Sequence, residues 1–337
     1  MQPRFEELLA LHAESISREL AERHGCVAWD RVRLIGQAQQ RLRELRDRRH
    51  HGLGGEGVIV VERRSQPLEA LPRALSYLRR GRPVVVRLER GGLRSSIEIL
   101  RRMSAMIGPA LSVCEADALT PAYAEGWPEG GVDLAAPRIG FVDLDADEEV
   151  AAYLLARSCL RRTGFDPRSV HRVVVAGHRP RLERHLRRLW LGVKMGPPDD
   201  PSAFAGPVGD EQADRFHQAC AQWEASPGVE VLCPGARLER PDGGPGRRYV
   251  APALFRSESA DTPDDPPELV GPMLILEVVE PGDAERRLAA LAPRDGHALW
   301  LRFGRPKERA GLARDDRQIE GALLIERLPP GLPAPRP

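Results

Sequence analysis

The chain of 337 residues carries 50 Lys and Arg against 49 Asp and Glu, so its formal net charge is +1. This balance creates no long-range field that would steer a nucleic acid or an anionic membrane to the protein. No apolar run reaches the roughly 18 residues of a membrane span, and the amino terminus lacks the basic and apolar regions of a signal peptide, so we expect a cytoplasmic protein.

The predicted elements alternate between helices and strands. Apolar residues recur at intervals of three and four from Phe5 to about Arg49, which predicts two or three amphipathic helices. Short β-branched runs between amphipathic stretches then predict strands joined by helices. The predicted strands are 58–61, 83–88, 110–114, 139–143, 171–176, 230–233, 248–255, 273–279, 297–303 and 321–326, and the later helices are 69–80, 95–107, 148–162, 179–191, 210–224 and 307–315. This order indicates an α/β fold built from β-α-β units with parallel strands.

Three segments interrupt this order. Residues 257–267 are dense in Asp and Pro and predict an exposed loop. The GGPGRR run at 243–248 lacks the Lys-Ser/Thr pair of a P-loop and predicts a hairpin turn instead. The Pro-rich tail from Pro329 is expected to be disordered.

The segment 193–212, VKMGPPDDPSAFAGPVGDEQ, closely resembles a segment of the aldehyde dehydrogenase superfamily. Further runs match that family in the same order: IGFVD with DAD at 139–147, HRVVV at 171–175, VEVLCPG at 229–235, YVAPAL at 249–254 and ELVGPM at 268–273. The resemblance implies an aldehyde dehydrogenase-like α/β fold, with a reduced Rossmann-type lobe and a catalytic-domain-like α/β lobe.

This resemblance sets the expected domain limits. A helical segment is expected over 1–56 and a reduced cofactor-type lobe over 57–190. The catalytic-domain-like lobe is expected over 191–328, followed by the tail over 329–337.

The resemblance implies that the active-site positions of the family are degenerate here. Where the family carries its nucleophilic cysteine in a Gly-Gln-x-Cys run, this chain reads GFDP at 164–167, which places Pro167 at the nucleophile position. A thiolate must add to the aldehyde carbon and later leave from a thioester, and proline has no nucleophilic side chain. The amide that binds the oxyanion corresponds to Gln66, and the general base, a Glu in the family, corresponds to Asp133. No catalytic residue is expected at these three positions.

The cofactor positions are also reduced. The lysine that reaches the adenosine ribose corresponds to Arg87, and the glutamate that holds the nicotinamide ribose corresponds to Glu268. The Gly-rich helix start that would support a pyrophosphate is missing, since only a short passage separates Ala110 from Asp133. No cofactor is therefore expected, with NAD or NADP bound through Arg87 and Glu268 as the alternative.

Two functional hypotheses follow. The first is a catalytically inactive aldehyde dehydrogenase-like protein with a binding, regulatory or structural role, acting with a protein partner or by self-association. The second is an NAD(P)-dependent aldehyde oxidoreductase or acyl-transfer enzyme that uses a displaced thiol such as Cys159. The helical pattern around Cys159 favours a buried structural thiol over a reactive one. No metal site is expected, because the five cysteines are widely spaced without a CxxC pair.

Overall fold

The computed structural model describes residues 5–47, 54–115, 124–130, 138–238, 242, 246–258, 268–291 and 299–304. The chain divides into two compact units, unit 1 at residues 1–133 and unit 2 at residues 134–337. The expected lobe boundary at residue 190 differs from this division. Strands on both sides of residue 190 belong to one sheet of unit 2, so the change of unit falls earlier, at residues 133–134.

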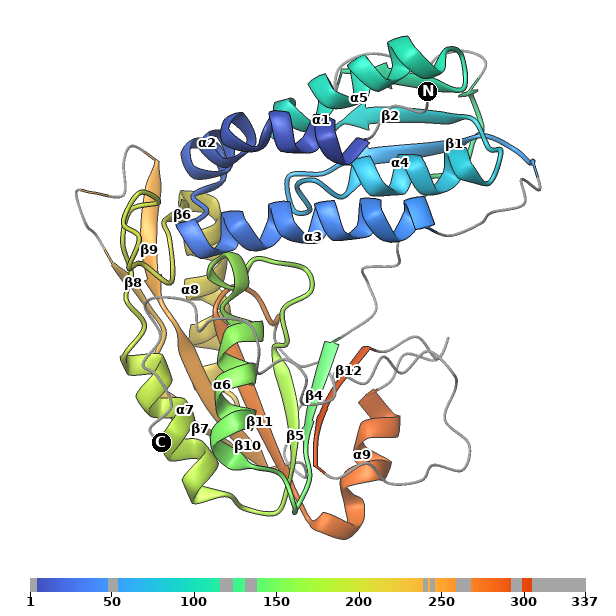
Figure 1. Ribbon diagram of the computed structural model, residues 1–337. Coiled ribbons are helices and arrows are strands. Elements are labelled where there is room, and N and C mark those ends of the chain that lie inside the picture. Colours follow the sequence, from blue (N-terminus) through green and yellow to red (C-terminus); the bar gives the residue numbers. More distant parts are fainter. Residues whose placement is uncertain are drawn as a thin grey trace. The chain divides into compact units, whose positions relative to one another are not determined.

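Unit 1 combines a helical segment with a parallel sheet (Figure 1). The predicted amino-terminal helices are confirmed as α1 (Phe5–Leu11), α2 (Ala13–His24) and α3 (Ala28–Asp47). β1 (Val58–Glu62), β2 (Val84–Leu88) and β3 (Leu111–Cys114) pair in parallel in that order. The connections are α4 (Ala70–Arg79) and α5 (Arg94–Ile107), which completes the predicted β-α-β rhythm.

One apolar core holds unit 1 together. Ile16 and Leu20 of α2 lie on one helical face and are fully buried, because residues four apart meet on the same side of a helix. They pack in the same cluster as Val60 of β1 and Val86 of β2. α2 ends at Gly25, whose φ of 67° supplies the left-handed cap that turns the chain into α3.

Unit 2 is built on a six-stranded sheet in the order β12-β4-β5-β11-β10-β7. Its strands are β4 (Arg138–Val142), β5 (Arg172–Ala176), β7 (Val229–Cys233), β10 (Ala253–Glu258), β11 (Met273–Val279) and β12 (Leu299–Phe303). Neighbouring strands pair in parallel except β10 and β7, which are antiparallel. The helices are α6 (Glu148–Cys159), α7 (Pro180–Leu191), α8 (Asp210–Glu224) and α9 (Ala284–Leu291).

A second, small sheet accounts for one difference from the predicted strands. The expected strand 248–255 is two strands, β9 (Arg247–Ala251) and β10, separated at Pro252. Proline has no N–H to donate to a ladder, so a single strand does not continue through it. β9 instead pairs antiparallel with β8 (Ala236–Leu238) and β6 (Val208–Gly209). Of the turn predicted at 243–248, residues 243–245 lie outside the described residues, and Arg247 and Arg248 belong to β9.

Other predictions fall partly outside the described residues. Ser257 and Glu258, expected in a loop, complete β10, whereas residues 259–267 are not described. The elements expected at 307–315 and 321–326 and the tail from Pro329 also lie outside the described part of the chain. Within the described part, no helix combines the length and apolar character needed to cross a bilayer.

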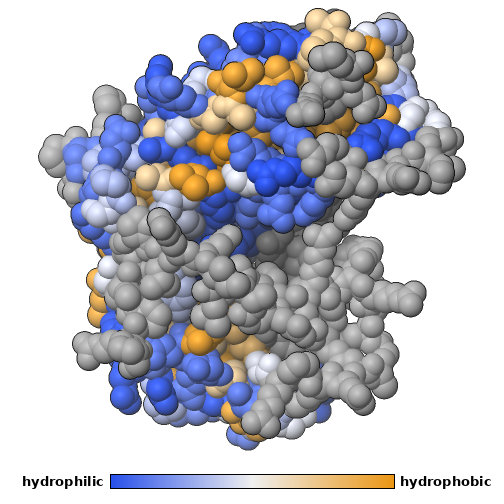
Figure 2. All heavy atoms as spheres, in the orientation of Figure 1, coloured by the Kyte–Doolittle hydropathy of each residue, from blue (hydrophilic) through white to orange (hydrophobic). Residues whose placement is uncertain are grey.

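Exposed apolar side chains are distributed over different elements. On the face shown in Figure 2, apolar residues are interspersed with hydrophilic ones. The most exposed large examples among the described residues are Leu11 on α1, Leu191 on α7 and Val32 on α3. Single exposed apolar residues of this kind are ordinary on protein surfaces and define no interface.

A buried ion pair connects α9 to the sheet of unit 2. Glu277 of β11 is fully buried. Arg287 of α9 donates two hydrogen bonds to it, from Nη2 to Oε1 at 2.6 Å and from Nε to Oε2 at 3.1 Å. A bidentate guanidinium–carboxylate pair is strong because both donors are aligned with both acceptors.

Replacing Arg287 with Ala is expected to lower the free energy of unfolding by about 3 kcal/mol, because the Glu277 charge loses its partner inside the protein. Arg286 is the matched control: it is 80% exposed and pairs with Asp283 at the surface. Arg286→Ala should change the free energy by less than about 1 kcal/mol. Equal effects of the two substitutions in urea unfolding would contradict this account.

Candidate functional site

The loop that contains the predicted nucleophile position begins with a left-handed turn. After α6 ends, Arg162 has φ 48° and ψ 45°, Thr163 has φ 53° and ψ 39°, and Gly164 has φ 79°. For residues with a side chain, this conformation costs about 1–2 kcal/mol each. It persists only where the surroundings hold it in place.

A reciprocal pair of hydrogen bonds holds Thr163 in this turn. The Thr163 hydroxyl donates to the Gly206 carbonyl at 3.1 Å, and the Gly206 N–H donates to the same hydroxyl oxygen at 3.0 Å. Both residues are buried. Gly206 belongs to the segment 193–212 that carries the strongest sequence resemblance, so this segment positions the loop.

Gly164 fixes the loop from the other side. A Cβ placed on Gly164 would lie 2.1 Å from the carbonyl carbon of Gly271 and 2.2 Å from the nitrogen of Pro272. Two backbones therefore approach at a distance that admits no side chain. Gly271 and Pro272 belong to the ELVGPM run, a second segment of the resemblance.

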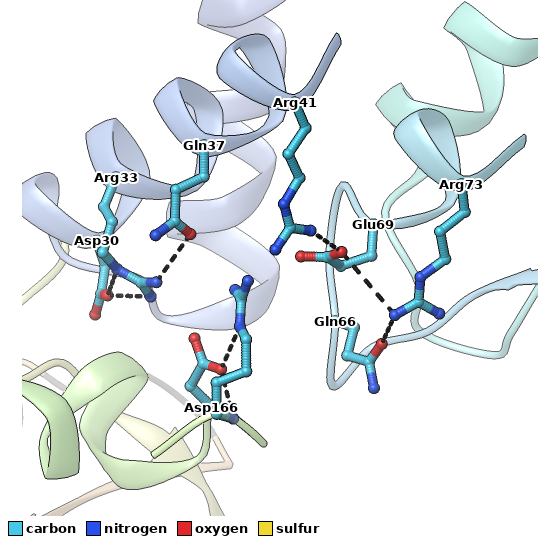
Figure 3. A network of polar contacts seen from close by, with 9 residues as sticks. Asp30, Arg33, Gln37, Arg41, Gln66, Glu69, Arg73 and Asp166 are labelled. Carbon is cyan, nitrogen blue, oxygen red and sulfur yellow. Dashed lines mark hydrogen bonds and ion pairs between the residues drawn. The ribbon is translucent and has the colours of Figure 1, made fainter. Parts of the chain in front are cut away.

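The centre of the loop holds no nucleophile. Pro167 is half-buried, and its neighbour Asp166 is 2% exposed. Asp166 Oδ1 accepts from the backbone N–H of Arg168 at 2.9 Å and from its Nε at 3.2 Å. Figure 3 includes this carboxylate. The Asp166 backbone carbonyl accepts from the Ser169 N–H at 2.8 Å, so Asp166 stabilises the turn around Pro167.

Cys159 is buried, as the sequence predicts for a structural thiol. It is fully enclosed, and its Sγ donates to the Met273 carbonyl at 3.2 Å. Burial raises the pKa of this thiol far above its ordinary value. The nearby His171 directs Nδ1 to the same carbonyl at 3.0 Å, and burial lowers the pKa of its imidazole. A neutral imidazole does not supply the positive charge that generates a thiolate.

The remaining cysteines, all within the described residues, are no better suited to act as a nucleophile. Burial raises the pKa of the Cys220 thiol to about 12 and also raises the pKa values of Cys114 and Cys233. Cys26 is 2% exposed. All five cysteines are free thiols.

The predicted oxyanion amide, Gln66, is part of a polar network in unit 1. Its Oε1 accepts from Nη2 of Arg73 at 2.8 Å, and the same Nη2 lies 4.0 Å from Glu69. Glu69 also pairs with Arg41 of α3, as the dashed lines of Figure 3 show. Gln66 is 7% exposed. Asp133, the predicted base position, lies outside the described residues.

The two predicted cofactor residues lie in different units. Arg87 is half-buried on β2, in register with Val61 of β1 and Cys114 of β3. Glu268 is exposed and forms an ion pair with Arg215 of α8. Its backbone carbonyl accepts from Nε1 of Trp223 at 3.2 Å.

The helix ends at the carboxyl edge of the unit 1 sheet are occupied by the chain's own carboxylates. Phosphates of nucleotides bind at such helix amino termini, where free N–H groups point outward. Here Glu62, at the end of β1, accepts from the N–H of Leu68 at 2.8 Å and of Ala70 at 3.1 Å, where α4 begins. Glu19 of α2 fills the corresponding end of α5.

The outer side of β1, which is an edge strand of this sheet, forms a short bridge. Ile59 pairs in parallel with Glu129, through the Ile59 N–H to Pro128 at 3.0 Å and the Gly130 N–H to Ile59 at 2.7 Å. Residues 131–137, which follow this bridge, lie outside the described part of the chain.

The sequence did not identify several residues that define this geometry. Thr163 and Gly206 are separated by 43 positions, and neither carries a local signal for the bond between them. Glu19 is one of several acidic residues in an amphipathic helix, so its role depends on a contact 75 residues along the chain.

No protein-family model matches the sequence, and no curated protein sequence matches it significantly. Solved structures do match. A methylmalonate-semialdehyde dehydrogenase from Oceanimonas doudoroffii has a TM-score of 0.72 at 18% identity, over 90% of this chain and 72% of that chain. An NAD-dependent benzaldehyde dehydrogenase from Corynebacterium glutamicum has a TM-score of 0.69 at 19% identity, over 90% and 74%. The chain has the fold of the aldehyde dehydrogenases.

The fold expected from the sequence is thereby confirmed. A mutant of aldehyde dehydrogenase C from Pseudomonas syringae, complexed with NAD+ and octanal, matches with a TM-score of 0.69 at 17% identity, over 90% of this chain and 71% of that one. Among the described residues of this aldehyde dehydrogenase fold, no group of three or more His, Cys, Asp and Glu side chains could hold a metal ion.

Gly164→Ala is expected to lower the free energy of unfolding by at least about 2 kcal/mol, because the new Cβ would meet the Gly271–Pro272 backbone and φ is positive. Gly282→Ala is the control, since no atom lies within 4 Å of its added Cβ. Chemical denaturation of both variants measures the difference. A neutral Gly164→Ala would refute the tight contact.

Glu62 generates a pH prediction. Burial raises the pKa of its carboxyl from 4.5 to about 8, against the effect of the two backbone hydrogen bonds, and the charge of Glu69 adds to the rise. The folded chain therefore holds this proton more tightly than the unfolded chain. The resulting stabilisation is complete below pH 4.5 and is lost as the pH rises through about 8.

The stability of the wild type relative to Glu62→Gln should therefore fall between pH 4.5 and about 8 and then level off. Urea unfolding across this range measures the difference. Glu98→Gln, on the exposed face of α5, serves as the control and should show no such trend. A constant or rising difference for Glu62→Gln would show that the buried carboxyl is ionised throughout.

Proposed function

We propose that this protein is a catalytically inactive member of the aldehyde dehydrogenase superfamily, with a binding, regulatory or structural role. The observation that carries the proposal is Pro167 at the position of the nucleophilic cysteine, in a loop whose nearest thiol along the chain, Cys159, is enclosed. Aldehyde oxidation by this fold needs a thiolate that reaches the substrate carbon. Neither residue meets that requirement.

The environment of Cys159 argues against a displaced nucleophile. Its Sγ is engaged with the Met273 carbonyl, and burial raises the pKa of the thiol. To react, Cys159 would have to leave the core on the inner face of α6 and lose this bond. A cavity would remain in its place.

The absence of a working dinucleotide site is part of the same proposal. The anion-binding ends of α4 and α5 are occupied by Glu62 and Glu19, and Glu268 is paired with Arg215. A pyrophosphate placed at the α5 end would meet the ionised Glu19, and like charges repel. At the α4 end the Glu62 carboxyl already accepts the N–H bonds that a phosphate would need. NAD and NADP are therefore not expected to bind as they do in active relatives.

The proposed role requires a binding partner, which we infer to be another protein or a second copy of the chain. The formal charge of +1 offers no attraction to a nucleic acid or an anionic membrane. The described surface also lacks a metal-binding cluster of His, Cys, Asp and Glu that would indicate a metal-dependent activity.

The first test is turnover. The purified full-length chain should not reduce NAD or NADP with propanal, benzaldehyde or octanal, because no thiolate reaches the substrate. Formation of the reduced dinucleotide is followed by absorbance, with an active aldehyde dehydrogenase as the positive control. Turnover that Cys159→Ala abolishes would establish the alternative, an oxidoreductase with a displaced thiol.

The second test is thiol reactivity. Iodoacetamide near neutral pH should label Cys159 and Cys220 only after unfolding, since burial protects both sulfurs. Pro167→Cys is the matched gain-of-label control, because position 167 is half-buried in the same loop. Mass spectrometry of the peptides locates the label. Rapid labelling of Cys159 in the native wild type would refute the proposal.

A further inference from the structure

Two buried side chains of unit 1 hold hydrogen-bond donors without an acceptor. Gln66, between β1 and α4, is 7% exposed, and its Oε1 accepts from Nη2 of Arg73 at 2.8 Å. This bond fixes the orientation of the amide, so the Gln66 nitrogen points away from Arg73, as Figure 3 shows. Within the described part of the chain, no group accepts from this nitrogen or from the buried Nε of Arg73.

These donors have an energetic consequence. A buried donor without an acceptor costs about 1–3 kcal/mol, and folded proteins leave few such groups. The Gln66 amide carries two N–H bonds on its nitrogen, and the Arg73 guanidinium carries five. The two side chains therefore present donors to an acceptor that the described residues do not supply.

The same cluster carries an excess of positive charge. Arg41 of α3 and Arg73 of α4 both face Oε2 of Glu69, and Nη2 of Arg73 lies 4.0 Å from that oxygen. Burial lowers the pKa of Arg73, and the charge of Arg41 adds to this effect against the opposing effect of Glu69. Glu62, another nearby acid, is fully buried, and burial raises the pKa of its carboxyl to about 8. It adds little negative charge near pH 7.

A carboxylate matches this combination of groups. It only accepts hydrogen bonds, and its two oxygens suit both amide and guanidinium donors. The side chain of Arg73 is 12% exposed, and an ion is held more strongly where little solvent competes for the donors. The side chain of Arg41 is 42% exposed, so the cluster extends to the surface. A neutral ligand could satisfy the amide but would leave the charge uncompensated.

We propose that Gln66, Arg73 and Arg41 form a binding site in unit 1 for a small carboxylate anion. The Gln66 nitrogen donates to a carboxylate oxygen, and the two guanidinium groups compensate the charge of the anion. The inference rests on the proposed binding role and deepens it, because it names a class of ligand. The three residues bind the anion and perform no chemical step on it.

The test offers the protein a small carboxylate and its uncharged analogue. Sodium propanoate or propanamide is titrated into the full-length wild type, Gln66→Glu, Arg41→Gln and Gln40→Glu at constant ionic strength. Saturation-transfer NMR measures binding, and thermal unfolding gives a second measurement. Gln40 is the matched control, because it is an exposed glutamine of α3 that donates to Glu44 at 3.0 Å, outside the cluster.

The wild type should bind propanoate saturably and propanamide at least about tenfold more weakly, which is the factor expected for one charge-assisted hydrogen bond. Gln66→Glu places a carboxylate beside Arg73. This variant should therefore lose propanoate binding and unfold at a higher temperature than the wild type. Arg41→Gln should weaken propanoate binding roughly tenfold. Gln40→Glu should bind propanoate as the wild type does.

Three outcomes would overturn the inference: no saturable propanoate binding by the wild type, equal binding of propanoate and propanamide, or unchanged propanoate binding in both Gln66→Glu and Arg41→Gln. Circular dichroism verifies folding, and the more exposed Arg41→Gln carries the test if Gln66→Glu does not fold. Turnover of aldehydes by the wild type would refute the proposed inactivity and leave the carboxylate site intact. A failed propanoate titration would remove only this ligand class.

Discussion

The left-handed turn from Arg162 to Gly164 is the constraint on which the loop around Pro167 depends. Its backbone is unfavourable for residues with side chains, so it needs support from outside the loop. Gly206 supplies this support through Thr163, and Gly271 supplies it through its contact with Gly164. The first support uses the Thr163 hydroxyl and the Gly206 backbone, and the second is a contact between two backbones. Neither support involves a thiol.

This constraint involves two of the segments that carry the resemblance. Two of the runs that resemble the aldehyde dehydrogenases, 193–212 and 268–273, contact the turn. Their glycines allow an approach that a Cβ would prevent. Packing alone can therefore explain why these segments resemble a family of enzymes. The loop that they support carries Pro167 at the expected nucleophile position.

Elsewhere in the protein, buried carboxyl groups connect neighbouring elements through hydrogen bonds and ion pairs. Glu62 and Glu19 satisfy helix N–H groups, Asp166 binds Arg168, and Glu277 binds Arg287. Each is enclosed or nearly so, and each has donors that offset the loss of hydration. These groups lie at helix ends and between elements, where they stabilise the fold.

The sequence by itself determined the α/β order, the described strands other than β6 and β8, the buried character of Cys159 and the likeness to aldehyde dehydrogenases. Apolar periodicity and short β-branched runs are local signals, and they located β1, β2, β5 and β11 to within a residue or two. The split at Pro252 was also encoded locally, in a residue that cannot donate to a ladder, although the predicted strand continued through it.

Only the tertiary structure decided the unit boundary, the support of the Pro167 loop and the occupation of the helix ends. β4 and β5 join β10 and β11 in one sheet, a pairing that no local pattern specifies. Thr163 meets Gly206, and Glu19 meets Ser95, across 43 and 76 positions. The physical reason is that a hydrogen bond depends on distance in space, whereas periodicity and propensity report only on neighbours along the chain.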